Sequence, residues 1–434
     1  MLIPTLLIPT LPRSAGFFAS LAVVLPLAVV IPLAAVLPLA VGQTDPAKES
    51  AKNSEAARLI EVRFRATELE PIIGELVVQN AKYGMLLLNE DGEMVTIPAA
   101  AKGSSKPSDP STEPDASIQS IQSIVELEGP MKATPPKELA EKCLVLMPQG
   151  AKFIVTEHFV VCYDTTDVYA RWNANLYERM YKGMVRFWKE KGIELESPRF
   201  PMVALIFSHQ DDYVEYSKRD FRGGENTFGY YTQTTNRLAT FDLTGIEGML
   251  PPGAQVQREE LITEIFSRPQ AERQVATILH EACHQIAFNT GLQRRLGDYP
   301  FWLSEGIATF FESPDFNSSS GWGGTGKINY FNLSNLRQYA RVRPADSMMK
   351  LLVQDDLLRR GETSTAAYAE SWGLTYFLIK RKPKNFVEYL KLLRERLPGN
   401  PADAKQRLDD FRSCFGEDLD KLDKEFVRFV GTLR

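Results

Sequence analysis

The stretch that decides the fold is TILHEACHQ, residues 277–285, which carries the pattern HExxH inside an apolar run. In a helix each residue turns by about 100°, so His280 and His284 lie on one face, one turn apart. Both imidazoles can therefore reach one metal ion, and Glu281 can contact a water on that ion without being a ligand. This is the arrangement of zinc hydrolases, and two histidines on an ordinary helix are the alternative.

A catalytic zinc takes three protein ligands, and the candidate for the third is Glu305 in PFWLSEGIATFFE, residues 300–312. We expect Gly291 to end the motif helix and a second helix to begin near Phe301. Glu305 has apolar neighbours, an unfavourable place for a carboxylate unless it binds a positive group. A glutamate favoured by the dipole of a first helical turn is the alternative. Glu312 shares the same helix face, but we expect solvent around it at the helix end.

The two motifs together resemble the gluzincin metallopeptidases of the peptidase MA-like clan, and within it a bacterial branch whose members are uncharacterised. The matching pieces are FGYYTQTTNRLATFDL, HEACHQIAFNTGL, DYPFWLSEGIATFFE and YAESWGLTYFL. The resemblance implies a catalytic domain with a small mixed sheet, the HExxH helix and a helical C-terminal part. It also implies a zinc ion (Zn2+) on His280, His284 and Glu305, and Glu281 as the general base that activates a water.

Three further positions take their meaning from this resemblance. Gluzincins bind an extended peptide by main-chain hydrogen bonds along an edge strand, which would here be Asn236 to Leu243, with an ordinary paired strand as the alternative. Tyr368 lies on a helix that the resemblance places beside the zinc, where it would either donate to the developing oxyanion or only pack. Thr309 stands where gluzincins have an acidic residue that supports a ligand histidine, so this support is in doubt.

Residues 1–42 differ from the rest of the chain, because Arg13 is the only charged side chain before Asp45. The uncharged run over residues 15–42 predicts an export signal, cleaved before Gln43, or a membrane anchor. A start codon placed too far upstream is the remaining alternative. We therefore expect an exported protein, either periplasmic, secreted or at the cell surface.

The domain organisation follows from composition and turn signals. Residues 43–56 form a polar linker, and residues 57–100 alternate in hydrophobicity around an Asp91-Gly92 turn, which predicts a small β module, either an SH3-like barrel or a hairpin. Residues 101–131 begin with a stretch rich in Ser, Pro and Lys and are expected to be a disordered linker. The metallopeptidase-like domain then covers residues 132–434, with an α+β half to residue 290 and a helical half from residue 291.

Within that domain the sequence predicts several elements before the motif helix. Residues 203–207 read as a buried strand, residues 227–231 and 237–241 as a hairpin, and residues 245–268 as a loop. Four cysteines allow three full pairings in an exported protein, and Cys143–Cys162 is the favoured pair.

The sequence thus predicts an α+β protein with a zinc metallopeptidase activity. A net charge of −5 gives no sign of the basic surface that nucleic-acid binding requires. The rival hypothesis is a non-catalytic envelope protein that binds partners through a vestigial site. The substrate, the cleavage specificity and the oligomeric state cannot be read from these residues.

Overall fold

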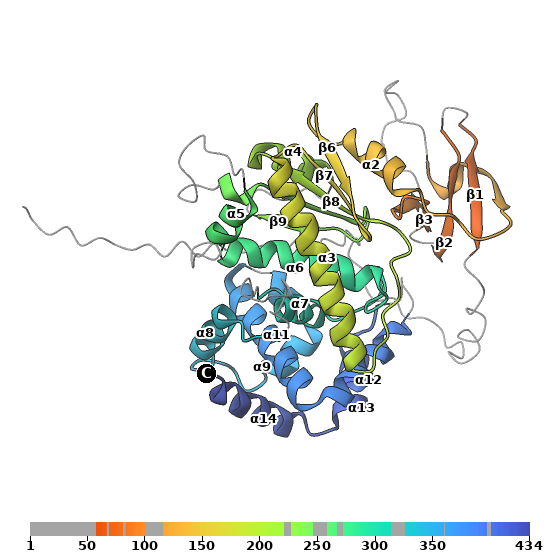
Figure 1. Ribbon diagram of the computed structural model, residues 1–434. Coiled ribbons are helices and arrows are strands. Elements are labelled where there is room, and N and C mark those ends of the chain that lie inside the picture. The colour runs from red at the N-terminus through yellow and green to blue at the C-terminus, as the bar shows by residue number, and fades with distance from the viewer. Residues whose placement is uncertain are drawn as a thin grey trace, which may run out of the picture.

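The computed structural model describes residues 58–434 except 67–68, 81–83, 100–115, 221–226, 246–257, 267–271, 314–325, 360 and 397–400. The predicted signal or anchor, the polar linker and most of the Ser- and Pro-rich stretch lie outside the described residues. The described part is an α+β protein with two five-stranded sheets and a large helical part (Figure 1). None of the helices in this part is both long enough and apolar enough to cross a membrane.

The small sheet lies at the N-terminal end and is antiparallel throughout, with the order β4-β3-β2-β1-β5. Its strands are β1 (Leu59–Phe64), β2 (Ile72–Asn80), β3 (Gly84–Leu88), β4 (Met94–Pro98) and β5 (Ile121–Glu126), with a 3-10 turn over Ile118–Ser120. The predicted hairpin is confirmed as β3–β4, and Gly92 takes the left-handed conformation, with φ 79°, that its turn requires.

One expectation about this region is wrong. Residues 101–131 are not all linker, because β5 pairs with β1 and completes the small sheet. The physical reason is that Ile118 and Ile121 pack against the buried core that β1 contributes. A short, mostly exposed strand that follows a polar stretch carries little local signal, and only its pairing partner identifies it.

The large sheet is mixed and has the order β6-β7-β8-β10-β9. Its strands are β6 (Lys152–Val155), β7 (Phe159–Tyr163), β8 (Met202–Phe207), β9 (Gly229–Tyr231) and β10 (Arg237–Phe241). The β8 strand is parallel to both β7 and β10, whereas β6 and β9 run antiparallel to their neighbours. The predicted buried strand and the predicted hairpin are therefore confirmed as β8 and as β9–β10.

The strand order corrects the expected substrate edge. Asn236 to Leu243 is β10 with its flanking residues, and β10 is paired on both sides, by β8 and by β9. The edge of the sheet on this side is β9 instead. The hairpin pattern identifies both strands, but only the long-range parallel pairing with β8 decides which of them lies inside.

Helices cover both faces of the large sheet, and alternation along β7 shows which face each helix covers. Phe159 stacks on Tyr177 of α3, whereas Cys162, on the opposite face, contacts Ala140 of α2. The helices of this half are α2 (Pro136–Leu144), α3 (Asp167–Glu190), α4 (Gln210–Asp220), α5 (Glu259–Phe266) and α6 (Glu272–Asn289). Helix α5 lies in the segment expected to be a loop, so that expectation is wrong in part.

Helix α6 carries the HExxH motif and lies between the sheet and the helical part (Figure 1). As predicted, Gly291 follows its C-terminus with φ 69°, and α7 begins at Phe301. The helices of the second half are α7 (Phe301–Phe311), α8 (Tyr330–Tyr339), α9 (Ser347–Val353), α10 (Asp356–Arg359), α11 (Gly361–Arg381), α12 (Pro383–Arg394), α13 (Ala404–Phe415) and α14 (Leu419–Thr432).

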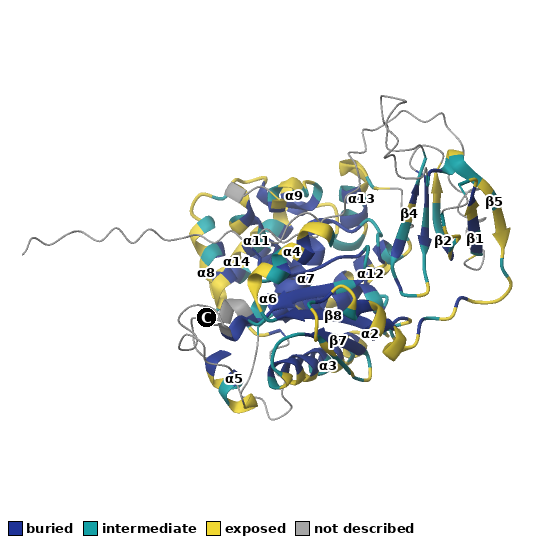
Figure 2. Ribbon diagram, turned by 90° about the horizontal axis from the view of Figure 1, so that it is seen from above, coloured by how far each residue is buried: buried dark blue, intermediate teal, exposed yellow. Residues whose placement is uncertain are grey.

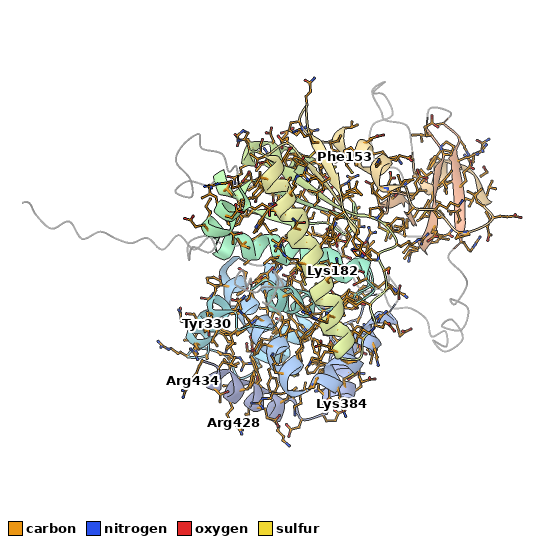
Figure 3. All side chains as sticks on the ribbon, in the orientation of Figure 1. Phe153, Lys182, Tyr330, Lys384, Arg428 and Arg434 are labelled. Atoms are coloured by element: carbon orange, nitrogen blue, oxygen red, sulfur yellow. The ribbon has the colours of Figure 1, made fainter. Side chains whose placement is uncertain are left out.

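Burial is concentrated where these layers meet. The strands β7 and β8 of the large sheet and helix α7 are dark in the burial view (Figure 2), and every residue of α7 is buried. Charged side chains such as Lys384, Arg428 and Arg434 lie at the outer rim of the helical part (Figure 3). Helix α7 is thus the central element of the helical half, with α6 on one side and α11 on another.

Gly306 of α7 allows the close approach of α11, and this gives a stability prediction. A Cβ on Gly306 would lie 2.8 Å from the main-chain oxygen of Ser371 and would also collide with Thr375. Because a backbone oxygen cannot swing aside, we expect Gly306→Ala to lower the free energy of unfolding by about 1–3 kcal/mol. Gly431→Ala is the control, since nothing lies within 4 Å of a Cβ there, and alanine in a helix gains about 0.5–1 kcal/mol over glycine. Urea unfolding of both variants measures the difference, and an unchanged midpoint for Gly306→Ala would contradict it.

The favoured cysteine pair lies together inside the domain as two free thiols. Cys143 of α2 and Cys162 of β7 are both fully buried. The Cys162 thiol contacts the main-chain oxygen of Ala140, one turn before Cys143. The hydrogen bond to Cys143 and, next in size, burial raise the pKa of the Cys162 thiol. The pairing of these two cysteines in an oxidising compartment stays a prediction.

Candidate metal centre

Three side chains that the sequence singled out as ligands meet at one point between α6 and α7. The Nε2 atoms of His280 and His284 are 3.1 Å apart, and the Nε2 atom of His280 lies 3.0 Å from Oε2 of Glu305. The Nε2 atom of His284 lies 3.5 Å from Oε1 of the same carboxylate. All three residues are buried, with at most 2% of their surface exposed. Each imidazole nitrogen therefore lies beside a different oxygen of one carboxylate, and we call these three side chains the triangle.

The size of this triangle fits a tetrahedral zinc ion. Bonds of about 2.0–2.2 Å at tetrahedral angles separate two ligand atoms by about 3.3–3.6 Å, and the observed separations are 3.1 Å between the two nitrogens and 3.0 and 3.5 Å from them to the two oxygens of Glu305. In addition, Oε1 of Glu305 is buried and forms no hydrogen bond to another described residue, since its contact with His284 is 3.5 Å long. An unpartnered, buried carboxylate oxygen is costly in a protein interior, and a metal ion beside it would remove that cost. The donor set thus has the chemistry of a group that could hold a metal ion.

The charges of the triangle support the same conclusion. Burial by itself would raise the pKa of Glu305, but the neighbouring His284 and His280 outweigh it and lower this pKa to about 2. Burial lowers the pKa of His284. The ionised Glu305 and the neutral His284 have the protonation states that metal ligands need. For His280, burial is outweighed by the hydrogen bonds to Glu305 and Glu312, which raise its pKa well above the usual value, so this histidine would release a proton when it binds a metal.

Glu312 supports His280 from the side opposite to the triangle. Its Oε2 lies 2.6 Å from Nδ1 of His280, and its Oε1 accepts a hydrogen bond of 2.6 Å from the side chain of Asn329. The expectation that solvent surrounds Glu312 is wrong, since only 12% of its side chain is exposed. The chain continues into α8, and Asn329, the N-cap of α8, covers this carboxylate. A carboxylate on Nδ1 fixes the imidazole tautomer so that Nε2 faces a metal.

Thr309, at the position where a supporting acid was expected, has a local role. Its hydroxyl donates to the main-chain oxygens of Glu305 and Gly306, one turn back in the same helix. The support for the ligand histidine therefore comes from a carboxylate seven residues after Glu305, not four.

Glu281 lies beside the triangle and faces the edge strand. Its Oε2 accepts a hydrogen bond of 2.9 Å from the main-chain N–H of Tyr231 in β9, while its Oε1 is buried and has no hydrogen-bond partner among the described residues. Burial raises the pKa of Glu281 to about 8, and the charge of His280 opposes this shift. A carboxylate with one oxygen anchored, the other free and a proton affinity near neutrality is suited to accept and return a proton.

Tyr368 of α11 also reaches this site. Its hydroxyl is buried, and burial, followed by the charges of Glu305 and Glu281, raises its pKa well above the usual value. The hydroxyl therefore stays protonated and next to the acidic cluster. A neutral O–H in this place can donate to a developing negative charge.

A polar network that the sequence did not reveal fixes α6 to the sheet. The Gln285 side chain donates to the main-chain oxygens of Val203 in β8 and Asn236 before β10. Asn289, one turn further along α6, exchanges hydrogen bonds with the side chain of Asn236, which has φ 57°. The network orients the histidine face of α6, and its only sequence signal was two amides one turn apart on an apolar helix.

A second group with metal-ligand chemistry lies at the surface and carries no comparable evidence. Glu157, His158 and Glu178 also bring their ligand atoms together. However, His158 already pairs with Glu178 at 2.9 Å, and Glu157 with Lys182 at 3.3 Å. Because these groups satisfy one another, His158 has the structural role that its neighbours imply.

Comparison with known proteins finds one family model that matches the part of the chain carrying the site. The family model "Protein of unknown function (DUF1570)" matches residues 274–400, which include the three ligands, Glu281, Glu312 and Tyr368. The match covers less than a third of the chain. A search of curated proteins finds no match.

Proposed function

We propose that this chain is a zinc-dependent metallohydrolase of the gluzincin type that cleaves peptide bonds. The observation that carries the proposal is the triangle of His280, His284 and Glu305, whose imidazole nitrogens and carboxylate oxygens lie 3.0–3.5 Å apart, with the Oε1 atom of Glu281 beside it. When bound there, zinc would lower the pKa of a water molecule and polarise a substrate carbonyl.

The side chains around the triangle divide the remaining work. Glu281 takes a proton from the attacking water through its free Oε1 and returns it to the leaving amine, while Tyr231 holds its other oxygen in place. Tyr368 donates its hydroxyl hydrogen to the oxyanion that develops at the carbonyl. Glu312 keeps His280 in the tautomer that presents Nε2 to the ion. Because Glu281 and the hydroxyl of Tyr368 are buried, their electrostatic contributions are stronger than they would be in solvent.

The substrate would lie along β9, the edge strand. The Tyr231 N–H points away from β10, since it donates to Glu281. In an antiparallel strand the main-chain groups alternate in direction, so Gly229 presents its N–H and C=O to the same free edge. An extended peptide can pair with these groups by strand addition. We therefore assign peptide binding to Gly229–Tyr231 and not to β10.

Metal content tests this proposal directly. Protein purified without chelator should contain about one zinc per chain, since the described residues contain one complete set of three buried ligands. Removing the metal should lower the free energy of unfolding. The loss should be about 4 kcal/mol relative to protein kept at a free zinc concentration of about 1,000 times Kd. Zinc should restore both the stability and the cleavage of a peptide library, whereas magnesium, which prefers six oxygen ligands, should restore neither. A chain that takes up no zinc on supplementation would refute the metallohydrolase, and one that takes up zinc but cleaves no peptide would favour a binding protein.

Export stays a prediction from the sequence, because residues 1–57 lie outside the described part of the chain. We expect the mature chain outside the cytoplasm, either starting near Gln43 or attached to the membrane by residues 15–42. Cell fractionation with N-terminal sequencing measures this. A cytoplasmic protein that keeps residues 1–42 would contradict it.

A further inference from the structure

The hairpin of the small sheet contacts the turn that follows the edge strand β9. We call residues 232–236, between β9 and β10, the β9–β10 turn. The main-chain N–H of Met94 donates a hydrogen bond of 2.7 Å to the main-chain oxygen of Thr234 in this turn. Glu93, in the β3–β4 turn, forms an ion pair with Arg237, the first residue of β10. The small sheet is therefore joined to the large sheet next to the candidate metal centre.

Arg295 reinforces this joint from the other side of the turn. Its Nη1 donates to the main-chain oxygen of Gly92 at 2.6 Å, and its Nε donates to the main-chain oxygen of Gln233 at 3.1 Å. Its Nη2 donates to the same Gln233 oxygen and to that of Thr234. Only 9% of Arg295 is exposed, and all its hydrogen bonds in the described part of the chain go to carbonyl oxygens. The flat guanidinium thus connects the hairpin with the β9–β10 turn.

The β9–β10 turn in turn determines where the edge strand lies. Tyr231, the last residue of β9, immediately precedes the turn, and its hydroxyl donates to Asn236 at the end of the turn. The main-chain N–H of Tyr231 is the group that anchors Oε2 of Glu281. A shift of the turn therefore moves the donor that orients this carboxylate. The three ligands of the triangle make no contact with Arg295 among the hydrogen bonds and ion pairs of the described residues.

We infer that Arg295, together with the β3–β4 hairpin, is a positioning element that orients the carboxylate of Glu281 through the β9–β10 turn. This inference rests on the proposed function for its catalytic consequence, but its structural step stands on the contacts alone. It gives the N-terminal β module a role in the reaction, in place of an independent binding role. A displacement of about 1 Å at a catalytic group can cost about 100-fold in rate, so small movements of the turn suffice.

The test compares Arg295→Lys and Arg295→Ala with the parent chain. Lysine keeps the charge and most of the stem, but its single ammonium cannot connect three carbonyl oxygens in one plane. Arg294→Lys and Arg294→Ala are the matched controls, because Arg294 is the preceding residue and is exposed. Each variant is measured for zinc content, for hydrogen–deuterium exchange in a peptide covering residues 229–236, and for kcat and KM on a peptide that the parent cleaves.

We expect both Arg295 variants to exchange faster over residues 229–236, to keep their zinc, and to lose about 10- to 100-fold in kcat with little change in KM. The Arg294 variants should match the parent. Unchanged exchange over residues 229–236 in both Arg295 variants would overturn the inference, and so would zinc loss in parallel with activity, because Arg295 would then serve general stability. If the parent cleaves no peptide, the proposed function fails separately, and the exchange measurement alone decides whether Arg295 fixes the turn.

Discussion

Replacing Glu281 by glutamine should abolish peptide cleavage and leave the zinc in place. Glutamine keeps the shape of the side chain, and its amide oxygen can still accept the hydrogen bond from Tyr231. The amide cannot take a proton from the attacking water, and loss of a general base costs about 10²- to 10⁴-fold in rate. The zinc stays because Glu281 is not one of the three side chains whose ligand atoms meet in the triangle.

The measurement pairs kcat on a peptide cleaved by the parent with elemental analysis of the same preparation. Glu388→Gln is the matched control, since Glu388 is exposed on α12 and pairs only with Lys391 at the surface. The control should keep both activity and metal. Full activity in Glu281→Gln would show that another group takes the proton, and loss of zinc in this variant would show that Glu281 is a ligand.

The three candidate ligands could be read from the sequence because local signals single them out. His280 and His284 share a face whatever surrounds them, and the glycine after α6 and the start of α7 follow from local signals that the structure confirms. Glu305 was predictable because a carboxylate among apolar residues needs a positive partner. These inferences depend on residues within one or two turns of each other.

The contacts that orient the site could not be read in the same way. Arg295 meets Gly92 across 203 positions of the chain, and Asn236 meets Asn289 across 53. The inner place of β10 depends on its parallel pairing with β8, which no local pattern encodes. The fifth strand of the small sheet was missed for the same reason, since its apolar residues are few and its partner is β1. Sequence periodicity identifies elements, whereas tertiary pairing decides their neighbours.

The position of Glu312 could be predicted from the helix period, but its role could not. The different roles of Glu312 and Glu305 give the second large expected effect. The helix period puts both glutamates on one face of α7 and its C-terminal end. The structure separates their roles, because Glu305 lies at the Nε2 side of His280 and Glu312 at its Nδ1 side. We therefore expect Glu305→Ala to remove one of three ligands and to lose the zinc under conditions in which the parent retains it.

Glu312→Ala should weaken zinc binding by about 10- to 100-fold, the usual effect of removing a partner of a ligand histidine. Glu312→Gln should lose less zinc affinity, because its amide oxygen can still accept a hydrogen bond from the Nδ1–H of His280 while Asn329 remains nearby. Competitive zinc titration measures the zinc affinity of the three variants. We expect Glu305→Ala to bind zinc most weakly, Glu312→Ala more tightly and Glu312→Gln most tightly of the three. If Glu312→Ala lost the metal while Glu305→Ala kept it, the triangle would not be the metal site. The gluzincin-type proposal would then lose its main support, because His280 would bind the ion through Nδ1 beside Glu312 and away from Glu281.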